Sequence, residues 1–270
     1  MKKILIVASA AAVFATGAHG ADIGARPYVK APLLDPSYNW SSFYAGVNAG
    51  GAWGRSRAAT STVDTPAYFD AANVVEINRV GNMRLDSSGF TGGGQIGFNW
   101  QGNGPVVWGA EADFSYLGLK ASGDVTVPYP TVAPNAFTIH QDVKTQWLFT
   151  ARPRVGYAFD RTLLYVTGGV AVTELKYNAV FSDVFGNGVT GSVSKTVVGW
   201  TVGGGIEYAF AKNWSLKGEY LYADFGNVST AGTKNAVLIG NSGTGNPFTH
   251  SADLSLRLAR VGLNYKLGGY

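Results

Sequence analysis

The chain has 270 residues, of which 46% are hydrophobic and only 14% charged, whereas about 25% of a typical soluble domain is charged. This apolar and aromatic content excludes a disordered chain, and the absence of cysteine excludes disulfides, thiolate metal sites and cysteine nucleophiles. A net charge of +4 without any basic run gives no support to a nucleic-acid partner.

Residues 1–20 have the pattern of a secretory signal peptide. Two lysines precede an apolar stretch at residues 4–14, and the small residues Ala18 and Gly20 precede Ala21. The apolar stretch is far shorter than the ~20 residues that a membrane-spanning helix needs, so an anchor is disfavoured. No later segment has a long apolar run either, which excludes a bundle of membrane helices.

Residues 21–40 are expected to form an extended segment on the periplasmic side. Pro27, Pro32 and Pro36 fall within this segment and interrupt both helices and strand ladders. The remaining residues, 41–270, are assigned to a single β-barrel domain.

From residue 41 onward, apolar and polar side chains alternate with the period of two that is typical of β-strands. Between residues 106 and 116, for example, Trp108 and Phe114 share one face, while Glu111 and Asp113 share the other. Eight strands are predicted, at residues 42–53, 89–100, 106–116, 144–159, 163–177, 196–210, 214–225 and 252–267.

Connection lengths favour a membrane barrel over a soluble sheet, although the alternation alone fits both. Short turns at residues 101–105, 160–162 and 211–213 alternate with long segments rich in Gly and Ser at 54–88, 117–143, 178–195 and 226–251. Outer-membrane barrels combine short periplasmic turns with longer external loops. The predicted fold is therefore an all-β, eight-stranded, antiparallel up-and-down transmembrane β-barrel with four long external loops.

Aromatic residues gather near the predicted strand ends, where amphipathic rings suit the two membrane–water interfaces. Tyr44 and Phe159 belong to this set. The other aromatics predicted to lie at an interface are Trp53, Trp100, Trp108, Tyr116, Tyr157, Tyr208, Phe210, Trp214, Tyr222 and Tyr265.

The last predicted strand ends close to the chain terminus and is expected to pair with the first, because an open edge in lipid leaves backbone groups unsatisfied. Two irregularities stand out. Pro153 lies within a strand, where we expect a bulge. Residues 252–258 are out of phase with the end of their strand, which indicates either a loop or a second bulge.

Eight charged residues are predicted to face the lumen: Glu111, Asp113, Arg152, Arg154, Glu207, Lys217, Glu219 and Arg260. Four are acidic and four are basic. An eight-stranded barrel is just wide enough for side chains to fill it, and buried charges must be paired. We expect a salt-bridged plug; the alternative is a narrow pore lined by the same residues.

Enzymatic motifs are lacking. His140 and His250 are both expected in external loops, and the glycine runs at residues 92–94 and 203–205 lie inside strands, where no helix follows to form a phosphate loop. No nucleophile motif and no metal-spaced histidines are present. We therefore expect no enzyme activity, cofactor or metal, although an outer-membrane hydrolase or acyltransferase stays open.

Three segments, at residues 38–48, 154–160 and 260–267, resemble the small porin-like β-barrel outer-membrane proteins of alpha-proteobacteria. The resemblance covers most of the chain beyond residue 20. It implies an eight-stranded barrel in the outer membrane. Roles in the family range from structural surface antigen to porin, and some members bind hemin; no ligand residue can be carried over to this chain.

The sequence thus predicts a structural, porin-like outer-membrane protein with loops at the cell surface. Its expected partners are outer-membrane lipid, lipopolysaccharide and the outer-membrane assembly machinery, and its oligomeric state stays open. The alternatives are a barrel that takes up hemin or a small solute, with His140, His250 or a loop tyrosine as iron ligand, a narrow diffusion pore, and a soluble lipocalin-like carrier.

Overall fold

The predicted alternation corresponds to long strands in a computed structural model, which describes residues 38–63, 68–242 and 246–268. The expected signal peptide, residues 1–20, and almost all of the expected periplasmic segment, residues 21–40, lie outside the described residues. The strands are β1 (Ser42–Thr62), β2 (Asn82–Gln101), β3 (Val106–Pro128), β4 (Ala136–Phe159), β5 (Thr162–Asp183), β6 (Gly188–Tyr208), β7 (Trp214–Ala231), β8 (Thr233–Lys234) and β9 (Phe248–Leu267).

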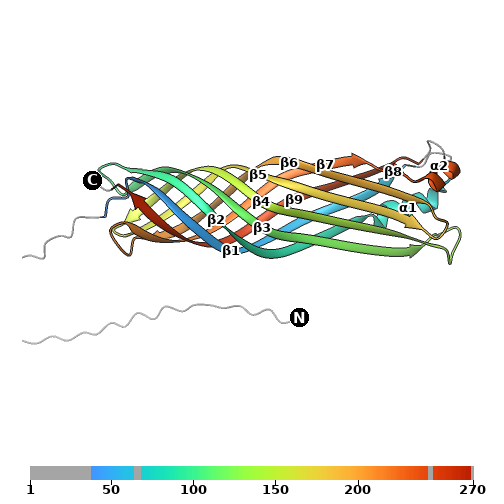
Figure 1. Cartoon of the computed structure of the whole chain (residues 1–270), viewed down its shortest axis with the longest axis horizontal. Coiled ribbons are helices and arrows are strands. Elements are labelled where there is room, and N and C mark those ends of the chain that lie inside the picture. The colour runs from blue at the N-terminus through green and yellow to red at the C-terminus, as the bar shows by residue number, and fades with distance from the viewer. Residues whose placement is uncertain (1–37, 64–67, 243–245, 269–270) are drawn as a thin grey trace, which may run out of the picture. The chain divides into compact units, whose positions relative to one another are not determined.

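Eight long strands of the described chain form a closed antiparallel ring, which confirms the predicted fold class (Figure 1). Each long strand pairs with the next long strand along the chain, so that β7 pairs with β9. β9 also returns to pair with β1, from Phe43 opposite Leu267 to Thr62 opposite Phe248. The two-residue β8 only adds to the end of β6. In the half near the tight turns this closure leaves no open edge, as a barrel in lipid requires. Toward the other end, β6 pairs with β7 only from Trp200 to Tyr208, and β8 covers Val189 and Thr190, so the edge of β6 between them has no ladder partner among the described residues.

One end of the barrel carries the tight turns. The connections at residues 102–105, 160–161 and 209–213 join β2 to β3, β4 to β5 and β6 to β7, close to the predicted positions. Asp160 adopts a positive φ of 52° in the two-residue connection, as tight hairpin turns of the primed types require. Residues 38–41 and 268 lie at this same end (Figure 1).

The opposite end differs from the prediction, because most of the four expected loops, at residues 54–88, 117–143, 178–195 and 226–251, are strand. The connections shrink to residues 63–81, 129–135, 184–187 and 232–247. Two of them contain the helices α1 (Ala71–Val80) and α2 (Ala236–Ser242). None of the helices in the described residues is both long and apolar enough to span a membrane.

The strands are longer than predicted because the polarity of the two faces of the wall is reversed partway along the barrel. The inward face changes from polar to apolar and the outward face from apolar to polar, as β9 illustrates. In its half near the turns, Arg260 and Asn264 point inward, whereas in the other half Leu254, Leu256 and Leu258 do. Burial alternates without interruption through this strand, and its register with β1 is unbroken. Against β7 the register shifts by one residue between Asp224 and Asn227, but the extra residue lies on β7 and not on β9. The expected loop or bulge at residues 252–258 was therefore wrong; the phase stays the same and the polarity changes.

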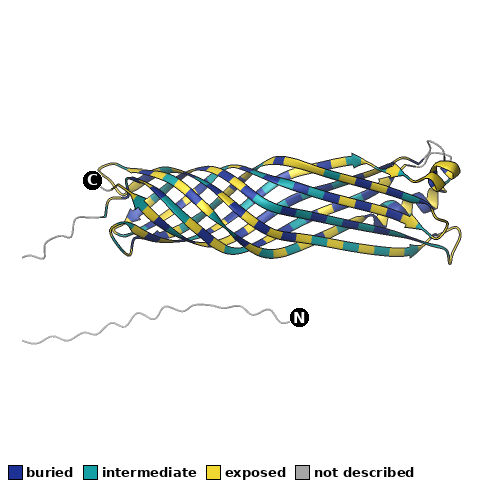
Figure 2. Ribbon diagram, viewed as in Figure 1, coloured by how far each residue is buried: buried dark blue, intermediate teal, exposed yellow. Residues whose placement is uncertain are grey.

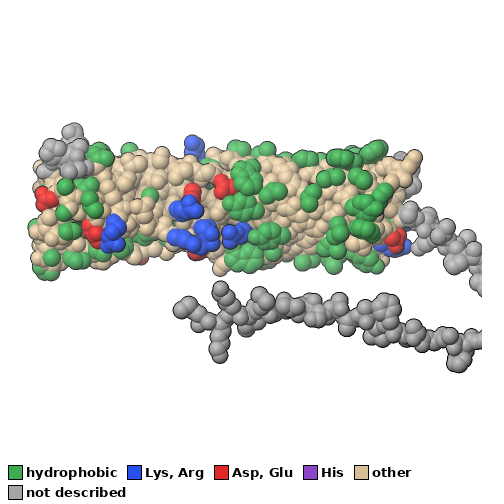
Figure 3. Space-filling view, turned by 180° about the vertical axis from the view of Figure 1, so that it is seen from behind, with side chains coloured by type: hydrophobic (Ala, Val, Ile, Leu, Met, Phe, Trp, Pro, Cys, Tyr) green, Lys and Arg blue, Asp and Glu red, His purple; other side chains and the backbone are tan. Residues whose placement is uncertain are grey.

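The same exchange occurs around the ring, so we distinguish an inner half, near the turns, from an outer half, near α1 and α2. Outward side chains of the inner half are apolar, such as Val47, Ile96 and Trp108. Outward side chains of the outer half include Arg57 and Lys120. Figure 2 shows the alternation of buried and exposed residues along the full strands, and Figure 3 shows hydrophobic side chains in bands over the inner half.

Pro153 causes no register shift, so the predicted bulge at this residue was also wrong. Pro153 pairs with Ala110 on β3 in regular register. On its other side, the pairs Ala151–Val170 and Arg154–Thr167 flank a gap in the ladder without a change of register. The Thr167 hydroxyl donates to the Pro153 carbonyl at 2.9 Å, so the local loss of ladder hydrogen bonds is partly replaced by a side chain.

Candidate functional site

The eight predicted charged residues lie together in the lumen of the inner half. Strand parity places them there: Glu111 and Asp113 alternate with outward residues of β3, and the others do the same on β4, β6, β7 and β9. Each of the eight residues is at most 5% exposed. We call this set the lumen charge cluster.

Glu111 holds the centre of the cluster. Lys217 Nζ donates to its two carboxylate oxygens at 2.7 and 2.9 Å, and Arg152 Nη2 donates at 2.8 Å. The Tyr44 hydroxyl donates at 2.7 Å. Lys217 lies opposite Glu207 in the ladder between β6 and β7, yet its ammonium group reaches across the lumen to β3. The ion pair therefore ties two distant parts of the ring together.

On the side of the outer half, two arginines bridge two carboxylates. Arg260 donates to Asp113 at 2.7 Å through Nη1 and to Glu219 at 2.5 Å through Nη2. Arg152 reaches the same two carboxylates at 3.0 and 3.2 Å. The Thr150 hydroxyl also donates to Asp113. These contacts link β3, β4, β7 and β9.

On the side of the turns, Glu207 accepts from Arg154 Nη2 at 2.8 Å, from the Ser215 hydroxyl at 2.5 Å and from the Asn264 amide at 2.8 Å. The Arg154 guanidinium also lies over the ring of Tyr165, 4.5 Å from its centroid. Planar guanidinium groups suit this combination of ion pairing and stacking. Every charge in the cluster thus contacts at least one opposite charge.

Burying eight charges is tolerable only because they balance and are bonded to one another, since an unpaired buried charge is very unfavourable. The four acids and four bases leave the cluster with no net formal charge. Removing one member leaves its former partner desolvated without compensation. The geometry therefore suits rigid cross-linking of the barrel wall, and the side chains occupy the lumen in doing so.

Two apolar layers follow in the lumen of the outer half. The first is aliphatic and includes Leu117, Leu119, Leu221 and Leu256, all buried. The second lies nearer to the end of the barrel that carries α1 and α2. It consists largely of aromatic side chains, and the buried side chains of α1 pack against them. Its largest members are Phe69, Tyr129, Phe137, Phe181 and Phe248, and α1 contributes Val74, Ile77 and Val80.

Ten of the twelve aromatics predicted to gather near strand ends, Phe159 among them, point outward and are between 40% and 56% exposed. Tyr222 is half-buried and packs on Trp200 with ring centroids 5.4 Å apart. Tyr44 was wrongly grouped with the outward set: it is 5% exposed and bonds to Glu111 in the lumen. Parity identifies it, because its neighbour Phe43 is outward.

Neither histidine lies in a loop as predicted. His140 is on the outer face of β4, where its Nδ1 lies 2.6 Å from an oxygen of Asp124. His250 is on β9 and faces the lumen of the outer half, with Nδ1 2.9 Å from the Thr60 hydroxyl. Burial lowers the pKa of His250 to about 4. Among the described residues, no three His, Cys, Asp or Glu side chains form a group able to hold a metal ion.

Sequence reasoning also missed the neutral partners of the cluster. Tyr165, Thr150 and Ser215 each hydrogen bond to one of its carboxylates. Gln95 and Asn264 join them through an amide hydrogen bond of 2.5 Å. All five lie at inward positions, so the same parity that identified the charges was a sufficient signal to find them.

Comparison with known proteins agrees with this architecture. The family model described as "Outer membrane protein beta-barrel domain" matches residues 6–266. The chain is 37% identical over 267 residues to the 31 kDa outer-membrane immunogenic protein of Brucella melitensis, covering 98% of this chain and 99% of that protein. It is 29% identical to the 25 kDa outer-membrane immunogenic protein of Brucella abortus, over 98% of both chains. The 22 kDa outer membrane protein of Rhizobium leguminosarum bv. viciae is 31% identical over 173 residues, 60% of this chain and 70% of that one.

Solved structures with similarity include the outer membrane protein OprG of Pseudomonas aeruginosa, at 10% identity and a TM-score of 0.44, covering 86% of this chain and 99% of that one. The outer membrane protease OmpT of Escherichia coli is at 8% identity and a TM-score of 0.40, covering 84% and 97%. Such low identities carry no information on function. The family model and the relatives confirm the expected family and location: this chain belongs to the outer membrane protein β-barrel family and is an outer-membrane protein.

Proposed function

We propose that the chain is a structural, porin-like barrel without enzymatic activity, whose lumen is closed and whose outer half is presented at the cell surface. The observation that carries this proposal is the lumen charge cluster, in which all eight buried charges are paired across the barrel. The relatives named as immunogenic outer-membrane proteins support surface exposure.

The membrane would surround only the inner half. Its outward apolar residues run from an inner girdle with Trp100, Trp108 and Trp214 to an outer girdle with Trp53 and Trp200. An outer-membrane barrel has an apolar band about 25 Å tall, flanked by aromatic girdles. The outer half, with charged outward residues and an apolar lumen, resembles a soluble barrel and would stand above the bilayer.

Three successive layers support a closed lumen. The charge cluster lies in the inner half, the aliphatic layer follows, and the aromatic cluster with α1 covers the outer end. An ion entering this path would have to displace paired charges and then cross apolar side chains that cannot replace its water. We therefore propose no conducting pathway under resting conditions.

Single-channel recording of the purified full-length chain in planar bilayers tests this proposal, with a known open porin as control for insertion. We expect no stepwise conductance across many insertions, each verified by the shift in gel mobility between heated and unheated samples. Reproducible unitary steps from the folded chain would overturn the closed lumen and favour the narrow pore.

Spectral titration with hemin tests the uptake alternative. His250 is fully buried, so external iron cannot reach its imidazole. His140 is partly exposed and bonds Asp124 through Nδ1, which leaves its Nε2 accessible, but the proposed structural role assigns no iron to that nitrogen. We expect no saturable change in the Soret band. A saturable shift that is lost in His140→Ala or His250→Ala would contradict the structural role and support uptake.

A further inference from the structure

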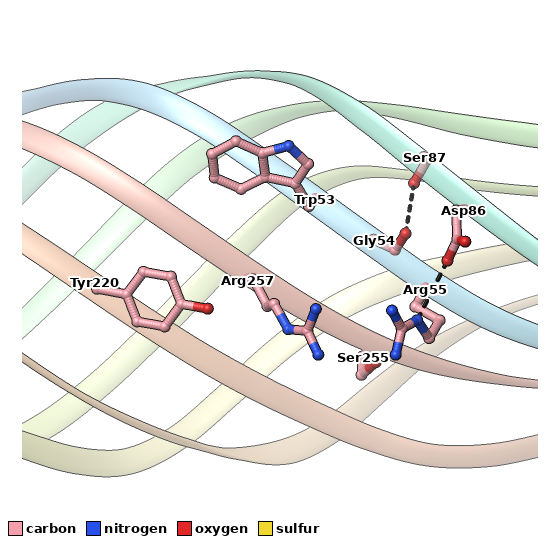
Figure 4. A pocket seen from close by; sticks show the side chains of 8 residues that line it. All are labelled: Trp53, Gly54, Arg55, Asp86, Ser87, Tyr220, Ser255 and Arg257. Atoms are coloured by element: carbon pink, nitrogen blue, oxygen red, sulfur yellow. Dashed lines mark hydrogen bonds and ion pairs between the residues drawn. The ribbon is translucent and has the colours of Figure 1, made fainter. Parts of the chain in front are cut away.

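A surface hollow of about 330 Å³ lies at the boundary between the inner and outer halves, on the outward face of β1, β2, β7 and β9. Trp53 and Tyr220 line it on one side, and two arginines, Arg55 and Arg257, line it on the other together with Ser255 and the carboxylate of Asp86 (Figure 4). It is thus apolar where it meets the apolar band and basic where the polar outer half begins. We call it the boundary hollow.

The two arginines of the boundary hollow point their guanidinium groups toward one another (Figure 4). They come from neighbouring strands: Arg257 lies opposite Trp53 in the ladder between β1 and β9, and Arg55 lies opposite Ser255. Like charges that face the same space repel, and an anion placed between them would relieve the repulsion. The space is open to the outside, so such an anion can reach it.

Both guanidinium groups have unused donors. Arg55 contacts Asp86 only through Nε, at 3.3 Å, which leaves its two Nη groups without a hydrogen bond among the described residues. The guanidinium of Arg257 makes no hydrogen bond or ion pair within the described part of the chain. Guanidinium forks bind phosphate oxygens through paired N–H donors, so both side chains are suited to phosphate.

The carboxylates nearby are already engaged. Asp86 also accepts from Arg84 at 3.0 Å, and Asp224 accepts from the Tyr222 hydroxyl at 3.2 Å. Asp253 accepts from the Arg57 backbone N–H at 2.5 Å. These carboxylates reduce the net positive charge around the hollow. They leave the Nη groups of Arg55 and the guanidinium of Arg257 without a hydrogen bond within the described part of the chain.

We propose that the boundary hollow binds the phosphate of a phosphorylated glycolipid in the outer leaflet, with its acyl portion against Trp53 and Tyr220. The inference rests on the proposed position of the bilayer around the inner half. At that position the hollow meets the lipid headgroups, and the aromatic rings meet the start of the acyl chains. Basic side chains near an anionic lipid surface each strengthen binding, and the effect is largest within a Debye length.

Two lysines on the outward face of the outer half provide a matched control. Lys120 on β3 lies opposite Lys144 on β4 in regular pairing, and neither lines the hollow. Figure 3 shows Lys and Arg side chains beside a hydrophobic band on the face it displays, so general attraction to anionic lipid is expected in addition to any site. Removing two charges from the hollow and, in a second variant, two charges from the lysine pair distinguishes binding at the site from general attraction to anionic lipid.

The experiment titrates the detergent-folded full-length chain with bisphosphorylated lipid A and follows binding by native mass spectrometry. We compare the wild type, Arg55→Gln/Arg257→Gln and Lys120→Gln/Lys144→Gln, with lipid A lacking both phosphates and inorganic phosphate as additional ligands. The heat-dependent gel shift verifies folding of each variant. We expect the hollow variant to lose roughly tenfold or more in affinity for lipid A, a smaller loss in the lysine variant, and weaker wild-type binding of lipid A without phosphates.

Several results would overturn the site. Equal losses in the two variants would assign binding to diffuse charge. Equal affinity for lipid A with and without phosphates would remove the role of the arginines, and inorganic phosphate bound as tightly as lipid A would identify a site for soluble anions. None of these results depends on conductance, so they leave the closed lumen to its own test.

Discussion

Replacing Lys217 by methionine removes one charge from the centre of the lumen charge cluster. Lys217 is 1% exposed, and its Nζ lies 2.7 Å from Glu111 and 3.7 Å from Glu219. Breaking a buried ion pair by removing one partner destabilises a protein by about 3–5 kcal/mol. Glu111 keeps Arg152 at 2.8 Å, so we expect the lower end, about 3 kcal/mol.

Equilibrium urea unfolding in phospholipid vesicles, followed by tryptophan fluorescence and by the heat-dependent gel shift, measures this loss. Lys195→Met serves as control because Lys195 is exposed on β6, and a surface change of this kind is expected to alter stability by less than about 0.5 kcal/mol. The double variant Glu111→Gln/Lys217→Met should be more stable than the sum of its single changes by about 1–3 kcal/mol. A loss in Lys217→Met no larger than in Lys195→Met would refute the reasoning.

Two further predictions concern packing and protonation. A Cβ on Gly93 would lie 2.1 Å from the Phe114 carbonyl oxygen, whereas one on Gly94 would meet nothing closer than 3.8 Å. Gly93→Ala should therefore lower the midpoint of urea unfolding, and Gly94→Ala should leave it nearly unchanged. Equal midpoints for the two variants would contradict the inward placement of Gly93. His250 lies in the outer half, outside the part that we propose to span the membrane, and its pKa of about 4 in the folded chain is below the ordinary 6.5 because of burial. The unfolded chain then binds a proton first as pH falls, so stability should be constant above about pH 6.5 and decrease by as much as about 3 kcal/mol toward pH 4; a His250→Asn variant that retained the same decrease would contradict this assignment.

The inner half of the barrel could be predicted from the sequence because lipid outside and charge inside make the alternation unambiguous. Trp108, Phe114 and Val261 mark one face, and Glu111 and Arg260 mark the other. The tight turns followed from the short gaps between these segments. In the inner half, a period of two also assigns the charged residues to a side of the wall, so membership of the lumen cluster was accessible without coordinates.

The outer half could not be predicted in the same way because its environment is reversed. There, Leu254 and Leu256 are inward, and Arg57 and Lys120 are outward, which is the pattern of a soluble sheet. When apolar residues are expected to face lipid, the polar outward residues of these segments indicate loops instead of strands. The alternation of inward and outward residues continues through these segments, although the apolar residues change from the outward to the inward face. An analysis that allowed for this change would have predicted longer strands and placed His250 on a strand.

Partner choice within the cluster was inaccessible for a different reason. Lys217 lies opposite Glu207 in the ladder but pairs with Glu111 across the lumen. Which strands face each other across a barrel depends on the stagger of the whole ring, and this stagger is not encoded in the spacing of any one strand. Sequence spacing identifies the charges that are enclosed, whereas only the closed ring determines their partners.

The central claim is that the wall separates lipid, water and an enclosed lumen in the order that parity assigns. Because the chain has no cysteine, single cysteines for spin labels can replace Trp108 and Trp200 on the inner half, Arg57 and Lys120 on the outer half, and Ser115 in the lumen. We expect oxygen dissolved in lipid to relax the labels at 108 and 200, a water-soluble nickel chelate to relax those at 57 and 120, and neither reagent to reach 115. A label at 115 that responds to either reagent, or labels at 108 and 200 shielded from lipid, would contradict the account.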